Sequence, residues 1–367
     1  MQTEDVIENE QQDRFIDEAT FHGDVASIEA LWQRAPIGDL DMPLIDIGQG
    51  EPLVFVSILE HLEYVYARQI SALSAGRRVI TYRRQESRTR FVGLAERAEE
   101  LKRVLDSLEL QRADFIGHGD GAMVLFEFAA RYPARCRSLI IIAQGADYQI
   151  APHPFIWLLH ELFLRLPVEH FLPAWFLRRI VINYIVSNRP VGADNELSPS
   201  KLGSSSESCH SERSEESVPR ETRILRCAQN DTIGATRITE FVGENSLSAP
   251  VPHSHDGVPR MLPQHLIEEQ FRKIALWPFV YKFSVLPIIH NFDMRERLAS
   301  LTMPVFLINR ANDALSPEAK TRWLAENLPN CAGYHVISGG ERFFMYAESE
   351  LVNRLIEGFL ITVKESK

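Results

Sequence analysis

Residues 114–143 read DFIGHGDGAMVLFEFAARYPARCRSLIIIA, and this stretch decides the fold. It opens with a predicted strand at 114–116 and continues through a glycine cluster into a helical pattern over 122–131. Pro133 ends that helix, because proline cannot continue the helical hydrogen-bond pattern. The run at 138–143 is apolar on both faces, as a central strand of a parallel sheet must be. The stretch therefore predicts a strand, a helix and a second, parallel strand.

The same alternation extends in both directions along the chain. Further strands are expected at 52–56, 78–82, 303–308 and 334–337, from short apolar runs that follow turn residues. Helices are expected at 94–108, 317–328 and 352–359. This rhythm predicts an α/β fold, with a mostly parallel twisted sheet flanked by helices on both faces.

Two regions interrupt the alternation and divide the chain. Residues 1–40 are expected to form a polar N-terminal extension before the first half of the core at 41–150, and residues 288–363 complete the core. Between the halves, 151–287 predicts a helical lid. Within it, about 190–258 is a low-complexity insertion predicted to be disordered, since nine of the residues 198–217 are serine. A passive insertion and a genuine binding loop are both open interpretations.

Composition excludes several classes of function. With 24% charged and 45% hydrophobic residues the chain is globular, and its net charge of −11 argues against nucleic-acid binding. Neither a secretory signal nor a membrane-spanning helix is expected, because the first twenty residues are mainly acidic and polar and no apolar run is long enough to span a membrane. The cysteines lack metal-ligand or disulfide-framework spacing, which predicts reduced thiols and a cytoplasmic location. They are Cys136, Cys209, Cys227 and Cys331.

Four segments resemble the α/β-hydrolase superfamily, in the order in which that family has them. The quoted stretch resembles its nucleophile elbow, and PLVFV at 52–56 resembles the strand before its oxyanion loop. MPVFLINRANDALSP at 303–317 is similar to the strand and turn that present the catalytic acid. YHVISGGERFFMYAESELVNRL at 334–355 is similar to the last strand, histidine loop and final helix. The resemblance covers 42–148 and 293–360 and implies an α/β-hydrolase fold of hydrolase ancestry.

The residues that carry the family's chemistry are altered. In the G-x-S-x-G elbow a serine attacks the substrate, but here Gly119 occupies that position. An ungapped alignment places Arg342 at the position of the catalytic histidine, and a guanidinium cannot accept the serine proton at working pH. Asp313 falls at the acid position. The resemblance thus implies a degenerate triad, and the ordinary Ser-His-Asp esterase mechanism is predicted to be absent.

Other residues near the elbow offer alternative roles. A frame shifted by one residue makes Asp120 a nucleophile beside His118, whereas the structural interpretation of Asp120 is a carboxylate at a helix N-terminus. Leu59 and Asp120 are predicted to offer backbone N–H groups to an oxyanion. Glu60 and His61 lie in the loop over the elbow, either as a relocated acid–base pair or as surface polar residues.

The substituted triad positions suggest an ion pair. A buried Asp313 without its histidine would be an uncompensated charge, so we expect Arg342 to pair with it, with Asp120 as a third member. The structural alternative for Asp313 is a loop aspartate that caps the helix beginning near Pro317. Truncating one partner of a buried pair would cost about 3–5 kcal/mol.

The sequence leaves two main functions open. The first is a non-catalytic or non-standard small-molecule-binding pseudoenzyme; the alternative is an active hydrolase or lyase with rearranged machinery that uses Asp120, His118 and Asp313. A small apolar or anionic ligand, or a partner protein at the lid, would fit the first. The aromatic lid residues are expected to pack on the core, roof a ligand pocket or form a contact patch; they are Trp157, Phe163, Phe171, Trp175 and Phe176.

No cofactor or metal is expected, because the histidines lack zinc-binding spacing. Those of the lid region are His153, His160, His170 and His290.

Overall fold

The computed structural model describes residues 15–147, 154–186, 224–225, 260–337 and 343–365, except 57, 60, 275, 276, 291, 312 and 314. Within these residues the strands form one sheet. Their bounds are β1 Gln33–Ile37, β2 Leu40–Ile47, β3 Pro52–Phe55, β4 Arg78–Tyr82, β5 Ala113–His118, β6 Cys136–Ile142, β7 Ile224–Leu225, β8 Val305–Arg310 and β9 Cys331–Ile337. Their order across the sheet is β1-β2-β4-β3-β5-β6-β8-β9-β7.

The middle of the sheet is parallel and its edges are antiparallel. Each neighbouring pair from β4 through β3, β5, β6 and β8 to β9 runs parallel, whereas β1, β2 and β7 pair antiparallel. All six predicted strands are present, with β5 and β6 at the centre. This confirms the predicted mostly parallel sheet.

The sheet begins before the predicted core boundary at residue 41. Strand β1 pairs with β2 in the register Ile37↔Leu40, so the two form a tight hairpin at the edge of the sheet. Arg34 and Asp41 pair across this hairpin. The mixed polar sequence of β1 obscures it, because an edge strand buries little of its surface: Ile37 is its only buried residue.

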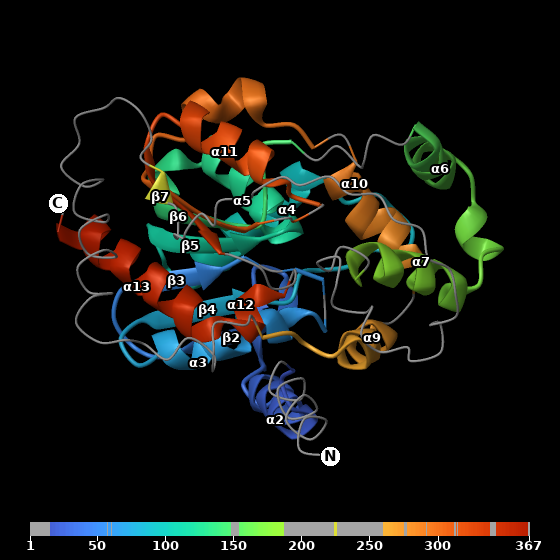
Figure 1. Cartoon of the computed structure of the whole chain (residues 1–367), viewed down its shortest axis with the longest axis horizontal. Helices are drawn as coiled ribbons and strands as arrows, with labels where there is room; N and C mark the ends of the chain where they lie inside the picture. The colour runs from blue at the N-terminus through green and yellow to red at the C-terminus, as the bar shows by residue number, and fades with distance from the viewer. Residues whose placement is uncertain are drawn as a thin grey trace, which may run out of the picture.

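Helices cover both faces of the sheet. Their bounds are α2 Glu18–Glu29, α3 Ala67–Leu73, α4 Leu94–Ser107, α5 Asp120–Arg131, α11 Glu318–Asn327, α12 Phe344–Ala347 and α13 Ser349–Glu365. In Figure 1, α3 and α13 lie against one face and α4, α5 and α11 against the other.

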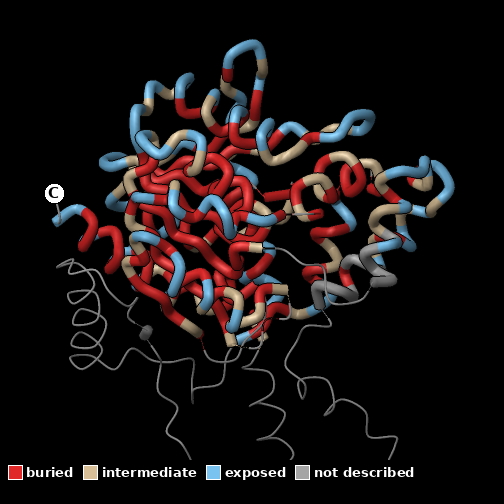
Figure 2. The backbone as a smooth tube through the Cα atoms, turned by 90° about the horizontal axis from the view of Figure 1, so that it is seen from above, coloured by how far each residue is buried: buried red, intermediate tan, exposed pale blue. Residues whose placement is uncertain are grey.

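Strand alternation explains these two layers. In β3 and the residue that follows it, Leu53 and Phe55 join the core under α3 and α13, while Val54 and Val56 join the core under α4 and α5. Successive side chains on a strand point to opposite faces, so four apolar residues in a row supply both cores. Figure 2 shows the resulting continuous buried centre.

Helices from the segment predicted to be a lid lie at one end of the sheet, and we call this group the lid. Its elements are α6 Pro154–Arg165, α7 Ala174–Val186, α9 Gln264–Lys273, a π-helix at Tyr281–Val285 and α10 Leu286–Ile289. Figure 1 places α6 and α7 farthest from the sheet. Most of the predicted insertion lies outside the described residues; β7, the part that is described, pairs with β9.

The predicted state of the cysteines is wrong at one position. Cys331 is disulfide-bonded, whereas Cys136 is a free, buried thiol. The spacing of the cysteines in the sequence did not reveal this bond. Among the described residues, no helix is both long and apolar enough to cross a bilayer.

Candidate functional site

The glycine cluster forms a tight joint between β5 and α5. Gly119 lies at the turn with φ 55° and ψ −121°, in the left-handed region that favours glycine, and its N–H donates to Ile142 O at 3.2 Å. A Cβ on Gly117 would lie 2.7 Å from Ala122 Cα, so the strand can approach the helix this closely only if the residue is glycine. The geometry is that of a nucleophile elbow, but Gly119 presents no reactive atom.

Asp120 is the first residue of α5 and pairs with an arginine from the segment that follows β4. Arg84, two residues after β4, donates from Nη1 to Asp120 Oδ2 at 2.7 Å. The Arg84 side chain is 1% exposed and that of Asp120 is 21% exposed. Asp120 thus takes the helix N-terminal place that the structural interpretation predicts, and Arg84 is a cationic partner that the sequence analysis did not anticipate.

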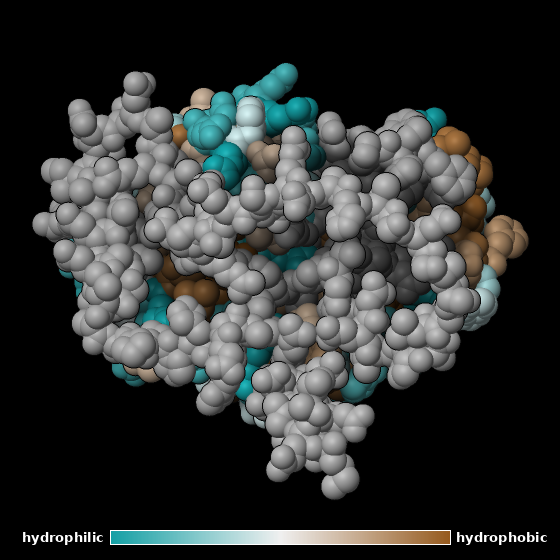
Figure 3. Space-filling model, in the orientation of Figure 1, coloured by the Kyte–Doolittle hydropathy of each residue, from teal (hydrophilic) through white to brown (hydrophobic). Residues whose placement is uncertain are grey.

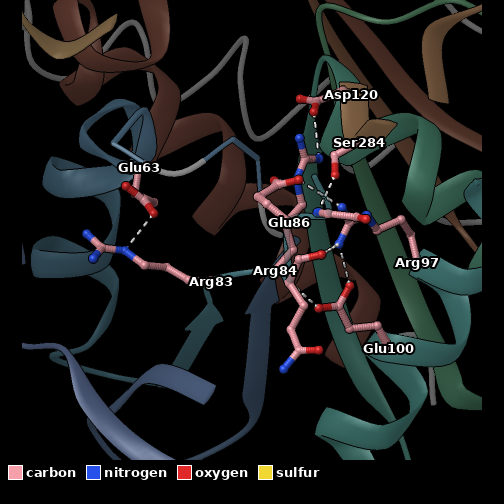
Figure 4. Close-up of polar contacts among 10 residues, drawn as sticks. Glu63, Arg83, Arg84, Glu86, Arg97, Glu100, Asp120 and Ser284 are labelled. Carbon is pink, nitrogen blue, oxygen red and sulfur yellow. Dashed lines mark hydrogen bonds and ion pairs between the residues drawn. The ribbon is translucent and has the colours of Figure 1, made fainter. Parts of the chain in front are cut away.

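This ion pair belongs to a chain of buried charges beneath the elbow, which we call the elbow charge cluster (Figure 4). Arg84 Nε lies 2.5 Å from Glu86 Oε1, and Glu86 Oε2 accepts from Arg97 Nη2 at 3.0 Å. Arg97 Nη1 then donates to Glu100 Oε2 at 2.8 Å. Opposite charges alternate along the cluster, so no member is left with an uncompensated buried charge.

The alternation also sets the protonation of the cluster. Burial alone would lower the pKa of Arg84, but Glu86 and Asp120 outweigh it and raise that pKa. Burial by itself would raise the pKa of Glu86. The opposite effect of Arg84 and Arg97 is larger, so the pKa of Glu86 lies below its usual value. Arg84 and Glu86 therefore stay ionised at neutral pH.

The lid is attached to this cluster. Ser284, in the π-helix, accepts from Ser87 N at 2.8 Å and also hydrogen-bonds Glu86. Nearby, Val92 N donates to Phe283 O at 2.8 Å. Figure 4 shows Ser284 beside Glu86 and close to the Arg84–Asp120 pair. The segment after β4 therefore joins the elbow to the lid.

A buried phenol lies within the influence of the same charges. Tyr66 donates to Val56 O at 3.4 Å. Burial first, and then the charge of Asp120, raise the pKa of Tyr66 above its usual value. Tyr66 is thus a neutral hydroxyl close to the elbow.

The predicted oxyanion loop leaves the sheet beside the elbow. Val56 N donates to Ile116 O at 2.8 Å, so the chain after β3 departs next to the end of β5. Leu59 in this loop is buried. Position 60 lies outside the described residues, so the proposed Glu60–His61 pair is not tested. His61 Nδ1 lies 4.0 Å from Glu29 of α2.

Asp313 follows β8, as its predicted role requires, and it is buried. Oδ1 accepts from Leu315 N at 2.9 Å and Ser316 N at 3.0 Å, which organises the turn before α11. Oδ2 lies 3.5 Å from Arg310 Nε. A cation and two amides thus compensate this carboxylate locally, and the predicted Asp313–Arg342 pair remains a prediction because 342 lies outside the described residues.

His118, the last residue of β5, is buried beside the turn. The oxyanion loop, the elbow and the acid turn follow β3, β5 and β8, which belong to the parallel part of the sheet; β3 and β5 are neighbours, and β8 lies beyond β6. Because the carboxyl ends of parallel strands lie at one edge of a sheet, all three segments leave from that edge.

The lid holds a polar cluster that the sequence analysis missed. His290 Nε2 lies 2.7 Å from Glu161 Oε1, and His160 Nε2 lies 3.1 Å from Tyr281 OH. The two histidine rings are 6.4 Å apart between centroids. Burial and nearby His290 lower the pKa of His160 to about 4, which keeps its ring neutral.

The remaining lid histidines are not part of this cluster: His170 is exposed and position 153 lies outside the described residues. No metal-binding group of histidine, cysteine and carboxylate side chains occurs in the described part of the chain.

Sequence comparison gives one limited relationship. No family model matches the chain. Over 109 residues it is 31% identical to a candidate non-heme haloperoxidase of Mycobacterium phage D29, covering 28% of this chain. The match spans 39% of the length of that curated relative.

Solved structures match over far more of the chain. An esterase from Thermogutta terrifontis has a TM-score of 0.56 at 16% identity, covering 90% of this chain and 99% of its own. An enol-lactonase from Burkholderia xenovorans LB400 has a TM-score of 0.56 at 13% identity, covering 90% and 100%. A bromoperoxidase from Bacillus anthracis has a TM-score of 0.54 at 16% identity, covering 90% and 99%. These identities support a shared fold and leave the chemistry open.

Proposed function

The chain has the α/β-hydrolase fold, and from that premise we propose that it is a pseudoenzyme that binds a small molecule beneath its lid. One observation carries the proposal: the backbone at Gly119 has the elbow geometry, yet the residue bears only hydrogen. Serine-type acyl transfer requires an oxygen there, and a triad loses most of its rate when any one member is removed.

The elbow charge cluster supports this proposal. Arg84 engages the carboxylate of Asp120, the nearest acidic side chain to the turn, at 2.7 Å. An oxygen that accepts a charge-assisted hydrogen bond is a weaker nucleophile, because its electron density is directed to the guanidinium. The cluster thereby favours a structural role for Asp120, whose pair with Arg84 joins the elbow to the segment that contacts the lid.

Labelling with a serine-directed fluorophosphonate, together with turnover of short p-nitrophenyl esters, tests the proposal. The wild-type protein is expected to show neither labelling nor turnover above buffer. Bromination of a reporter by bromide and hydrogen peroxide belongs in the same panel, because one similar structure is a bromoperoxidase. Turnover in any of these assays would overturn the pseudoenzyme proposal.

Restoring the missing groups sharpens the test. Gly119→Ser alone is expected to stay unlabelled, because Arg342 cannot act as base. The substitution should also lower stability by about 1–3 kcal/mol, because serine would adopt the positive φ of residue 119. Gly119→Ser combined with Arg342→His is expected to gain labelling. If Gly119→Ser alone were labelled, another base would lie at the turn and the assignment of Arg342 to the histidine position would be wrong.

A rearranged hydrolase or lyase is the second candidate, favoured by the partial exposure of Asp120 and by the neutral Tyr66 nearby. In this scheme Asp120 acts as nucleophile or base, with His118 and Asp313 assisting. Asp120→Asn would then abolish any turnover. Asp46→Asn is the matched control, since Asp46 is also a partly exposed carboxylate paired with an arginine, Arg78, but lies on β2 away from the elbow.

A further inference from the structure

The far end of the lid carries a cluster of exposed apolar side chains. Of the nine large hydrophobic residues exposed in the described part of the chain, six lie within residues 158–176. We call them the lid-tip patch: Leu158, Leu162, Leu166, Phe171, Trp175 and Phe176. Scattered exposed hydrophobics are normal on a folded protein, whereas a cluster of this kind marks an interaction surface.

The patch is continuous along two lid helices. Leu158, Leu162 and Leu166 follow one another at intervals of four residues, which places them on one side of α6 and its end. Beyond them Phe171 is 80% exposed and Trp175 is 65% exposed. Figure 3 shows hydrophobic surface at the right-hand edge, where Figure 1 has α6 and α7.

Both acidic residues between 158 and 179 are directed into the lid. Glu161 bonds His290 at 2.7 Å, and the buried Glu169 bonds Lys282 at 2.6 Å. Their negative charges are thus compensated inside the lid, although the chain as a whole carries a net charge of −11.

The exposed charged residues of the same segment are basic. Arg165 and Arg179 are exposed, and the Arg165 side chain is 78% exposed even though it pairs with Glu161. His170 adds a titratable group beside Phe171. The lid tip therefore presents leucine, phenylalanine and tryptophan side chains flanked by cations.

We propose that the lid-tip patch docks on the surface of a bilayer that contains anionic lipid. Tryptophan, phenylalanine and leucine insert at the boundary between headgroups and acyl chains, and arginine side chains bind the phosphates beside them. A second copy of the chain fits less well, because a two-fold interface would bring Arg165 and Arg179 close to their own equivalents. The inference goes beyond the proposed function and is independent of the elbow.

Vesicle flotation of the full chain tests the proposal. We expect binding to vesicles of three parts phosphatidylcholine to one part phosphatidylglycerol, and much weaker binding to phosphatidylcholine alone. The double variant Phe171→Ser with Trp175→Ser should reduce binding at least about tenfold, because it removes the two most exposed aromatic residues of the patch. Trp323→Ser is the matched control: Trp323 is 40% exposed on α11 and should be dispensable.

A charge variant separates lipid docking from simple apolar adhesion. Arg165→Gln with Arg179→Gln should lower binding to the anionic vesicles about fivefold or more and leave circular dichroism unchanged. Absence of vesicle binding by the wild-type protein, or equal binding by the Phe171/Trp175 variant, would overturn the proposal. If sedimentation velocity showed that the wild-type protein is a dimer and that the Phe171/Trp175 variant is a monomer, the patch would bind a second copy of the chain and not a bilayer.

Discussion

The elbow and the lid stabilise buried polar groups in different ways. Beneath the elbow the groups are charged, and Asp120, Arg84, Glu86, Arg97 and Glu100 compensate one another. In the lid, ion pairs lie beside a neutral imidazole, since His160 has a pKa of about 4 and contacts a tyrosine.

The difference predicts how each region responds to change. Paired buried charges should stabilise the fold equally at all pH values near neutrality, but removal of one member leaves its partner uncompensated and lowers stability. A buried neutral histidine leaves stability unchanged at neutral pH, but acidification lowers stability because protonation introduces a charge without a partner.

Removal of the shared cation should give the largest effect. Arg84→Met leaves both Glu86 and Asp120 without their common partner, and breaking a buried pair costs about 3–5 kcal/mol. Urea denaturation should therefore show a lower free energy of unfolding. A loss below about 1 kcal/mol would mean that water compensates the elbow charge cluster, contrary to its burial.

Acidification should have the second-largest effect on stability, and His335 is the residue of the core that should cause it. This residue of β9 is buried, and burial lowers its pKa to about 4 from an ordinary value near 6.5. A depressed folded-state pKa stabilises the fold above pH 6.5, and this contribution is lost as the pH falls towards 4. The change should amount to about 2–3 kcal/mol.

The variant His335→Leu should flatten that decline between pH 6.5 and 4 in urea titrations. His160, also with a pKa of about 4, provides the comparison within the lid. Hydrogen exchange should show α6 losing protection on acidification before β9 does. Simultaneous loss in both elements would show that lid and core unfold as one unit.

Glu63 should respond in the opposite direction. Burial raises its pKa to about 7, although Arg83 at 2.9 Å opposes the rise. Since the folded-state pKa lies above the unfolded value, stability is greatest below pH 4.5 and falls as the pH rises through 7. Glu63→Gln should reduce this loss, on the order of 2 kcal/mol, in melting curves at pH 5 and pH 8. An unchanged pH dependence would contradict the raised pKa.

An exposed pair provides the smallest effect and the control for Arg84→Met. Arg34 and Asp41 pair across the β1–β2 hairpin with both side chains largely exposed. Arg34→Ala should change the free energy of unfolding by less than about 1 kcal/mol, because solvent screens such pairs. A larger loss of unfolding free energy would show that an exposed arginine pair in the edge hairpin also contributes strongly to stability, and that burial alone does not explain the effect of Arg84→Met.

The sequence predicted the parallel strands and main helices because each required a local apolar pattern. The run at 78–82 is β4, and the helix predicted at 94–108 is α4, Leu94–Ser107. The hairpin strand β1 was missed because its edge position requires little apolar surface. The predicted elbow geometry was found at Gly119, since small residues at fixed spacing are a local signal.

The polar cluster of the lid was missed because it forms between residues distant in sequence. Glu161 and His290 are far apart in sequence, and no spacing rule joins them. One signal was available for the elbow charge cluster: Arg97 and Glu100 interrupt the apolar pattern of α4, and both are buried on the face that carries Leu101. A charged residue at such a position requires a buried partner, and Glu86 and Glu100 supply it.

The close approach at Gly117 separates architecture from reactivity. With Ala122 Cα only 2.7 Å from where a side chain would begin, glycine is required here simply for a central strand to turn into its helix. Glycine at this position is thus required by the backbone geometry of the strand–turn–helix unit, whether or not the protein is a catalyst. A genome survey that infers esterases from the glycines of this motif alone would therefore score the geometry of a turn, and not the presence of a nucleophile.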